Sequence, residues 1–223
     1  MAPGNGIDGL CSKVNDYLAS LSRFFTATNL QLSPTKSTAT LFTSWTKEVQ
    51  LQLKVKVDDT QIPTVNNPKI LGVTFDSLLS FSAHTTAIAT KVQNRNKVLK
   101  SLAGSTWGKD KEMLLSTFKA IGRPVLNYVA PLWSPGISDS QWTKLQTCQN
   151  TALRTVTGCF LMSPIQHLHN EAQILTVKEH NKLLSEQFLL GCYRRPHPLH
   201  LLLRSTLVVI VHHLADTLWM HLP

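Results

Sequence analysis

Residues 69–76 have the sequence KILGVTFD, and they mark the place where the pattern of the chain changes from strand-like to helical. The run is rich in β-branched and aromatic residues, which favours a strand. Gly72 within a strand suggests a bulge or the close approach of another backbone. The turn signal Asn66-Asn67-Pro68 precedes the run, and helical spacing begins after residues 76–82. The sequence therefore predicts two parts that meet here.

The part before this point is expected to hold one long helix and several short strands. Apolar residues recur at three- and four-residue steps over residues 8–27, which predicts an amphipathic helix that ends at Asn29. Its stripe consists of Leu10, Val14, Leu18, Leu21 and Phe25. Residues 37–43 are β-prone, and residues 49–57 alternate at strand period up to a turn signal at Asp58-Asp59.

The part after this point is expected to be helical throughout. Ser82 is predicted to cap a helix that ends near Gly104, and a second helix is predicted from Asp110 to about 122–124. Asp139 is predicted to cap a third helix, and later helices are predicted after Ser163-Pro164 and over residues 177–193. The predicted fold class is α+β, with a helix and short antiparallel strands followed by an all-helical region.

Composition excludes several classes of protein. Of 223 residues 43% are apolar and 16% charged, which is incompatible with wholesale disorder. No run approaches the roughly 20 apolar residues of a membrane helix, and the first residues do not resemble a secretory signal. The four cysteines (Cys11, Cys148, Cys159 and Cys192) are far apart, so we expect free thiols and an intracellular location.

Positive charge is concentrated in residues 86–125. This segment carries eight basic and two acidic residues, and so holds +6 of the net charge of +9. Lys91, Arg95, Lys97 and Lys100 are the candidate contacts to a polyanion such as nucleic acid. On charge alone, a solvated helix surface explains the pattern equally well.

The residues do not form a complete catalytic or metal site in the sequence. Asp58-Asp59 is the only adjacent acidic pair, and a solvated hairpin turn explains it better than a metal site. The Cys and His spacings do not match a zinc motif. Lys36 follows a Ser-Pro turn, where it is either a phosphate contact or an exposed turn lysine.

Several stretches, in order, resemble one family. Residues 15–25 and 29–37 look like the palm segment that follows the catalytic aspartates in reverse transcriptases of non-LTR retrotransposons (the LINE and jockey-like group). Residues 69–76 resemble the family's primer-grip motif Y/I-L-G-V-x-x-D. Residues 82–84, 120–133 and 145–158 resemble its thumb. The resemblance covers roughly residues 10–198.

This resemblance implies a truncated palm over residues 1–81, a helical thumb-like region over 82–198 and a divergent apolar tail over 199–223. Lys36 would be an auxiliary lysine near the incoming nucleotide, and Leu71 and Gly72 would position the primer end. Lys91, Arg95, Lys97 and Lys100 would follow the backbone of an RNA template and a DNA primer. An intact family member would require Mg²⁺ and would be found in the nucleus or cytoplasm.

The chain departs from the family in one decisive respect. The family's Y/F-x-D-D motif and its earlier palm aspartate do not occur in this sequence. The resemblance therefore implies a fragment of an RNA-directed DNA polymerase that is inactive alone and has the upstream part of the polymerase as a possible partner. The alternatives are a non-enzymatic nucleic-acid-binding module and a non-functional transposon relic.

Overall fold

A computed structural model of the chain describes residues 3–104 and 110–194. The chain divides into two compact units. The first contains the residues up to Lys91 together with Gly136–Leu145, and the second contains Val92–Pro135 and the residues from Gln146 onward. The chain passes between the units at three places, two of which fall within the long helices α2 (Ser82–Leu102) and α6 (Asp139–Thr157) and the third between Pro135 and Gly136. The predicted boundary between residues 81 and 82 stays a prediction, and the predicted tail 199–223 lies outside the described residues.

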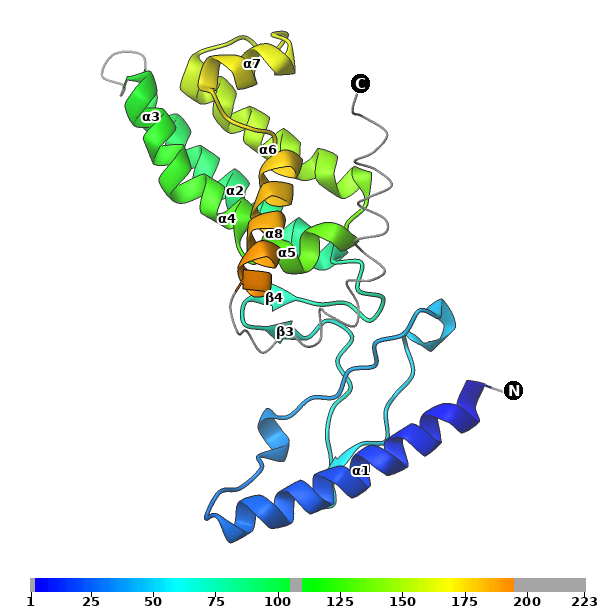
Figure 1. Cartoon of the computed structure of the whole chain (residues 1–223). Helices are drawn as coiled ribbons and strands as arrows, with labels where there is room; N and C mark the ends of the chain where they lie inside the picture. Colours follow the sequence, from blue (N-terminus) through cyan, green and yellow to red (C-terminus); the bar gives the residue numbers. More distant parts are fainter. Residues whose placement is uncertain (1–2, 105–109, 195–223) are drawn as a thin grey trace. The chain divides into compact units, whose positions relative to one another are not determined.

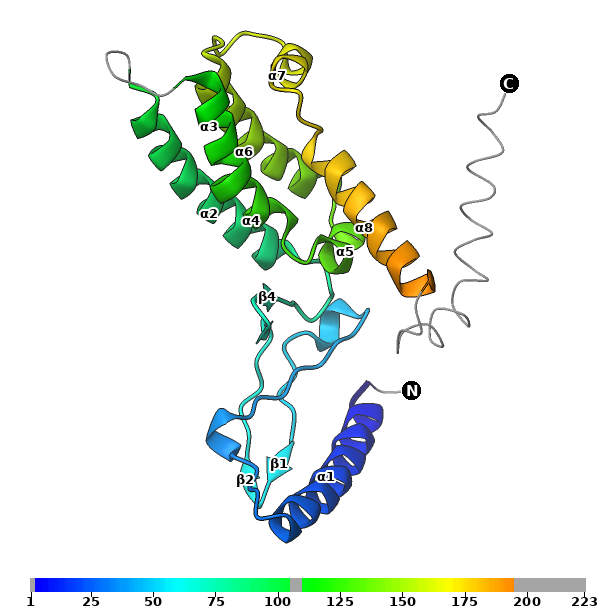
Figure 2. The ribbon, with the colours of Figure 1, turned by 60° about the vertical axis from the view of Figure 1, so that its left-hand side comes forward.

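The first unit is built on a long helix, α1 (Pro3–Ala27), which packs beside a small hairpin (Figures 1 and 2). The predicted helix is confirmed, with a start at Pro3, and it ends where Asn29 takes a positive φ of 58°. A buried apolar cluster joins the helix to the hairpin and consists of Cys11, Leu53, Val55, Val57 and Ile62. The predicted stripe is only partly covered, because Leu10 and Leu21 remain 48% and 45% exposed.

Among residues 3–104 and 110–194, four two-residue strands form two antiparallel hairpins. β1 (Lys56–Val57) pairs with β2 (Thr60–Gln61), and β3 (Lys69–Ile70) pairs with β4 (Val73–Thr74). The strands expected over residues 37–43 and 49–53 are absent, apart from an isolated bridge between Ala39 and Thr64. Two short 3₁₀ turns, η1 (Pro34–Lys36) and η2 (Thr46–Glu48), also lie in this part. The predicted α+β class is confirmed.

The second unit contains a helix that continues through a proline. α3 (Lys111–Thr117) starts next to the predicted Asp110, which caps the helix by accepting a hydrogen bond from the Met113 backbone N–H at 2.8 Å. A π-helical turn, Phe118–Gly122, then leads directly into α4 (Arg123–Asn127), and Figure 2 shows one continuous ribbon. The helix end predicted near 122–124 is therefore wrong. Proline has no backbone N–H to donate to the carbonyl four residues before it. The wider π-helical turn replaces that i→i−4 hydrogen-bond pattern, so the helix continues through Pro124.

The remaining helices follow the predicted spacing closely. α5 (Ala130–Trp133) and the 3₁₀ turn η4 (Ser134–Gly136) lead to α6, in which Asp139 is the first helical residue rather than the predicted cap. α7 (Ile165–Ala172) follows Pro164, and α8 (Val177–Arg194) starts at the predicted residue. Ser82 is the first helical residue of α2, and Phe81 with a positive φ of 54° precedes it, so the predicted serine cap is not formed.

Buried amide side chains join the helices of the second unit. Asn96 on α2 donates to the Cys148 carbonyl on α6 at 2.9 Å. Gln149 on α6 donates to the Leu175 carbonyl at 2.9 Å, and Asn181 on α8 donates to the Leu126 carbonyl on α4 at 3.1 Å. Because the three side chains are buried, these bonds set how the helices pack against one another.

Candidate nucleic-acid interface

Helix α2 carries basic residues and lacks acidic ones. Its sequence contains four cations and no Asp or Glu over Ser82–Leu102. One side of the helix is buried through Ile88, Val92, Asn96 and Leu99. The remaining surface faces water and carries all four predicted contacts, Lys91, Arg95, Lys97 and Lys100.

The four cations form two separate pairs. At about 100° per residue, Lys91 and Arg95 are neighbours on one flank of the buried line, and Lys97 and Lys100 are neighbours across the helix. Arg95 donates to the Ile121 carbonyl of the π-helical turn at 2.9 Å, and Lys97 contacts the Asn94 amide oxygen at 3.3 Å. Within the described residues, none of the four is joined to a carboxylate. The helix therefore presents two uncompensated cationic edges.

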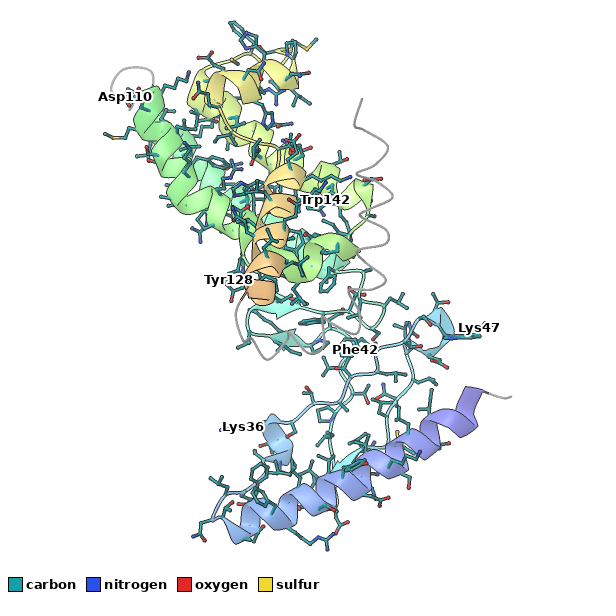
Figure 3. The ribbon with its side chains drawn as sticks, in the orientation of Figure 1. Lys36, Phe42, Lys47, Asp110, Tyr128 and Trp142 are labelled. Carbon is teal, nitrogen blue, oxygen red and sulfur yellow. The ribbon has the colours of Figure 1, made fainter. Side chains whose placement is uncertain are left out.

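Lys36 lies at the end of η1. The turn is closed by Ser37, whose side-chain hydroxyl donates to the Ser33 carbonyl at 2.8 Å. Lys36 itself is exposed, and Figure 3 shows its side chain projecting from η1. This placement is compatible with both interpretations of Lys36 that the sequence allows, a phosphate contact and an exposed turn lysine.

Leu71 and Gly72 form the tip of the β3–β4 hairpin. Their φ angles are 47° and 86°, which matches the two-residue turn that connects tight hairpins. The continuous strand expected over residues 69–76 is therefore wrong, and the bulge suggested at Gly72 is not formed, because Ile70 pairs directly with Val73. The role of Gly72 is to supply a positive φ. Leu71 is 87% exposed at the tip.

Asp58 and Asp59 form the turn between β1 and β2, as predicted. Both have positive φ, and Asp58 accepts a hydrogen bond from the Ser22 hydroxyl at 2.6 Å. In the part of the chain that the structure describes, three or more His, Cys, Asp or Glu side chains do not gather anywhere in a way that could hold a metal ion. The four cysteines are free, as predicted. Helices long and apolar enough to span a membrane do not occur among the described residues.

Asp76 and His84 organise the segment between the second hairpin and α2, and the sequence reasoning missed both. Asp76 accepts hydrogen bonds from the backbone N–H and the hydroxyl of Ser80, at 2.9 and 3.2 Å. His84 is buried on α2, and its Nδ1 accepts a hydrogen bond from the Thr74 backbone N–H at 3.3 Å. The spacing D-x-x-x-S could have indicated the contact between Asp76 and Ser80. The contact between Thr74 and His84 depends on tertiary packing and has no such signal in the sequence.

The His84 contact predicts a pH-dependent stability. Burial, and secondarily the positive charge of Lys91, lower the pKa of His84 below its usual 6.5. The unfolded chain therefore takes up a proton at a higher pH than the folded chain does. The free energy of unfolding should be highest above pH 6.5 and should fall as the pH drops toward the folded-state pKa, by at most about 1.4 kcal/mol per pH unit for this group.

Denaturant unfolding at a series of pH values checks this expectation. His84→Gln should weaken the dependence on pH. An unaltered pH dependence in His84→Gln would show that His84 does not titrate in this way.

Two curated proteins are similar to the chain. A probable RNA-directed DNA polymerase from transposon X-element of Drosophila melanogaster is 28% identical over 166 residues. A probable RNA-directed DNA polymerase from transposon BS of the same organism is 25% identical over 172 residues. Each match covers 74% of this chain and 18% of the relative, so the chain spans less than a fifth of these proteins.

These matches confirm the resemblance to a segment of retrotransposon reverse transcriptase that the ordered motifs predicted. No model of a known protein family matches the chain. No solved structure matches it either.

Proposed function

We propose that this chain is a segment of a transposon reverse transcriptase that holds the sugar-phosphate backbone of the template–primer duplex. The observation that carries the proposal is the acid-free helix α2, whose four cations are exposed and lack carboxylate partners among the described residues. Such cations bind phosphates mainly through the release of counterions, without reading sequence. The two similar proteins are both named as RNA-directed DNA polymerases, which supports nucleic acid as the ligand.

Two further positions have proposed roles within the same function. The exposed tip at Leu71 and Gly72 offers an apolar contact to the end of a primer, and the exposed Lys36 offers a point charge to a nucleotide phosphate. The chemistry itself would depend on Mg²⁺ in the intact polymerase. The described residues do not fit that role, because they do not bring three acidic side chains together. We infer that the upstream part of the polymerase supplies those carboxylates.

The salt dependence of binding tests the proposal. A fluorescent RNA–DNA duplex should bind the wild-type chain, with log affinity falling linearly against log salt concentration. The double variants Lys91→Gln/Arg95→Gln and Lys97→Gln/Lys100→Gln should each reduce the slope by about two, and the quadruple variant by about four. Glutamine has a helix propensity close to that of Lys and Arg, so α2 should persist.

A matched control separates the loss of a phosphate contact from a general loss of net positive charge. Lys13→Gln/Lys47→Gln removes the same charge from two exposed positions outside α2 and should leave the slope within experimental error of the wild type. If only one double variant alters the slope, that edge of α2 is the one that meets the backbone. Unchanged binding in the quadruple variant would refute the assignment of α2.

The same titration decides between the proposal and the alternatives. A non-enzymatic nucleic-acid-binding module would show the same salt slope. It would bind a duplex and a single strand of equal length with equal affinity, and a primer end on the duplex would not increase its affinity. A non-functional relic would lack saturable binding.

A further inference from the structure

Arg123 is a half-buried cation without a carboxylate partner in the second unit. It is the first residue of α4 and follows directly after the π-helical turn, where its backbone N–H bonds to the Phe118 carbonyl. Its guanidinium makes one hydrogen bond among the described residues, from Nη2 to the Leu175 carbonyl at 3.5 Å. That carbonyl already accepts the shorter 2.9 Å bond from Gln149. A guanidinium has five N–H donors, so most of its capacity is unused.

The surroundings do not neutralise this charge. Burial lowers the pKa of Arg123, yet a guanidinium stays protonated in proteins. The nearby acid Glu179 is already engaged, since its carboxylate accepts bonds from the Thr176 backbone N–H and hydroxyl at 3.1 and 2.7 Å. Glu186 pairs with Lys182 at 3.9 Å. A partly desolvated charge without a partner is costly unless an anion approaches it.

His180 lies on α8, which packs against α4, and the positive charge of Arg123 acts on its imidazole. The bond from Asn181 to the Leu126 carbonyl holds this part of α8 against α4. Burial, and secondarily the charge of Arg123, lower the pKa of His180. The imidazole is then neutral at pH 7 and offers one N–H donor next to a guanidinium.

We propose that Arg123 and His180 form a receptor for one phosphate group of a nucleic-acid backbone. The planar guanidinium would bind two phosphate oxygens as a fork, and the imidazole N–H would donate to one of them. The receptor adds to the four cations of α2 and lies close to one of them, because Arg95 donates to the Ile121 carbonyl of the π-helical turn that sets the position of Arg123. This inference deepens the proposed function and rests on it.

Affinity and salt dependence of the full chain for the RNA–DNA duplex test the receptor. Arg123→Gln should weaken binding about tenfold and reduce the salt slope by about one, because one charge-assisted contact is lost. Arg123→Lys should restore the slope but only part of the affinity, since an ammonium lacks the fork. Lys182→Gln is the matched control, because it removes an exposed cation from α8, and it should bind within about twofold of the wild type.

A second measurement does not depend on how well a variant folds. In the wild-type chain the ring-proton resonances of His180, assigned through His180→Gln, should shift when the duplex is added. Inorganic phosphate alone should shift them far less, since it lacks the additional contacts of the duplex. Equal shifts with both ligands would identify free phosphate as the ligand and would overturn the assignment to a backbone.

The remaining outcomes separate the two proposals. If the wild type binds the duplex, and Arg123→Gln binds equally well without a shift at His180, the receptor is refuted and the role of α2 stands. If the wild-type chain does not bind the duplex, both proposals fail.

Discussion

No template-dependent incorporation of labelled deoxynucleotide is expected from these 223 residues, beyond the level of a sample without protein. Two-metal nucleotidyl transfer requires carboxylates that hold both ions, and a lysine such as Lys36 does not replace them. The only adjacent acidic pair, Asp58-Asp59, forms a hairpin turn in which Asp58 is bonded to Ser22. An enzyme accelerates its reaction by a factor of about 10⁶ or more, and without the metal-binding carboxylates this acceleration is lost. The assay should therefore show no product at all rather than a reduced amount.

The assay needs a positive control for binding. The same sample should retain the RNA–DNA duplex in a polarisation measurement, so that a lack of product reflects missing chemistry rather than a missing complex. Mg²⁺-dependent incorporation that disappears in Asp58→Asn/Asp59→Asn would contradict the prediction and would make the hairpin turn a catalytic site.

The two units should differ by at least about a hundredfold in amide hydrogen exchange. The strands of the first unit are two residues long, and each strand pairs with only one other strand. An isolated two-stranded hairpin of this kind is only marginally stable in water. α1 leaves Tyr17 and Phe24 exposed at 77% and 62%. In the second unit, Leu153, Leu168 and Trp133 are fully buried, so the surrounding helices should open only in rare, larger unfolding events.

Native-state exchange followed by mass spectrometry makes this comparison within one molecule. Peptides from residues 50–76 should exchange fast, and peptides from the second half of α6 should exchange slowly. This result would agree with a first unit that the rest of a polymerase normally covers. Uniform protection of both regions would contradict the prediction and would favour an independently stable module.

Local chemistry along the chain explains which elements could be predicted. Helical spacing reflects contacts between residues three and four apart, so α1, α6 and α8 were predicted close to their observed positions. Asp110 as a cap and Asp58-Asp59 as a turn also depend only on neighbouring residues. The cations of α2 could also be named from the sequence, because they depend only on residue type and on a helix that local spacing predicts.

Other features needed contacts between distant parts of the chain. Strand-like residues 37–43 and 49–53 find only the single bridge between Ala39 and Thr64 in the first unit, so their propensity does not produce a ladder. KILGVTFD folds back on itself at Leu71-Gly72 rather than running straight, because β3 and β4 find their partners in each other. The helix through Pro124 survives because a π-helical turn precedes the proline.

Sequence alone predicts the class of the fold, the order of the helices, the position of the excess positive charge and the resemblance to a reverse transcriptase segment. These properties reside in local spacing and in residue type, and the grouping of the α2 cations into two pairs follows from helical spacing in the same way. Contacts between distant residues were needed to bury one side of α2, to join His84 to the Thr74 backbone, and to pack the part of α8 that carries His180 against α4 and Arg123. Such features arise from side chains up to 57 positions apart in the sequence, and packing alone brings those residues together.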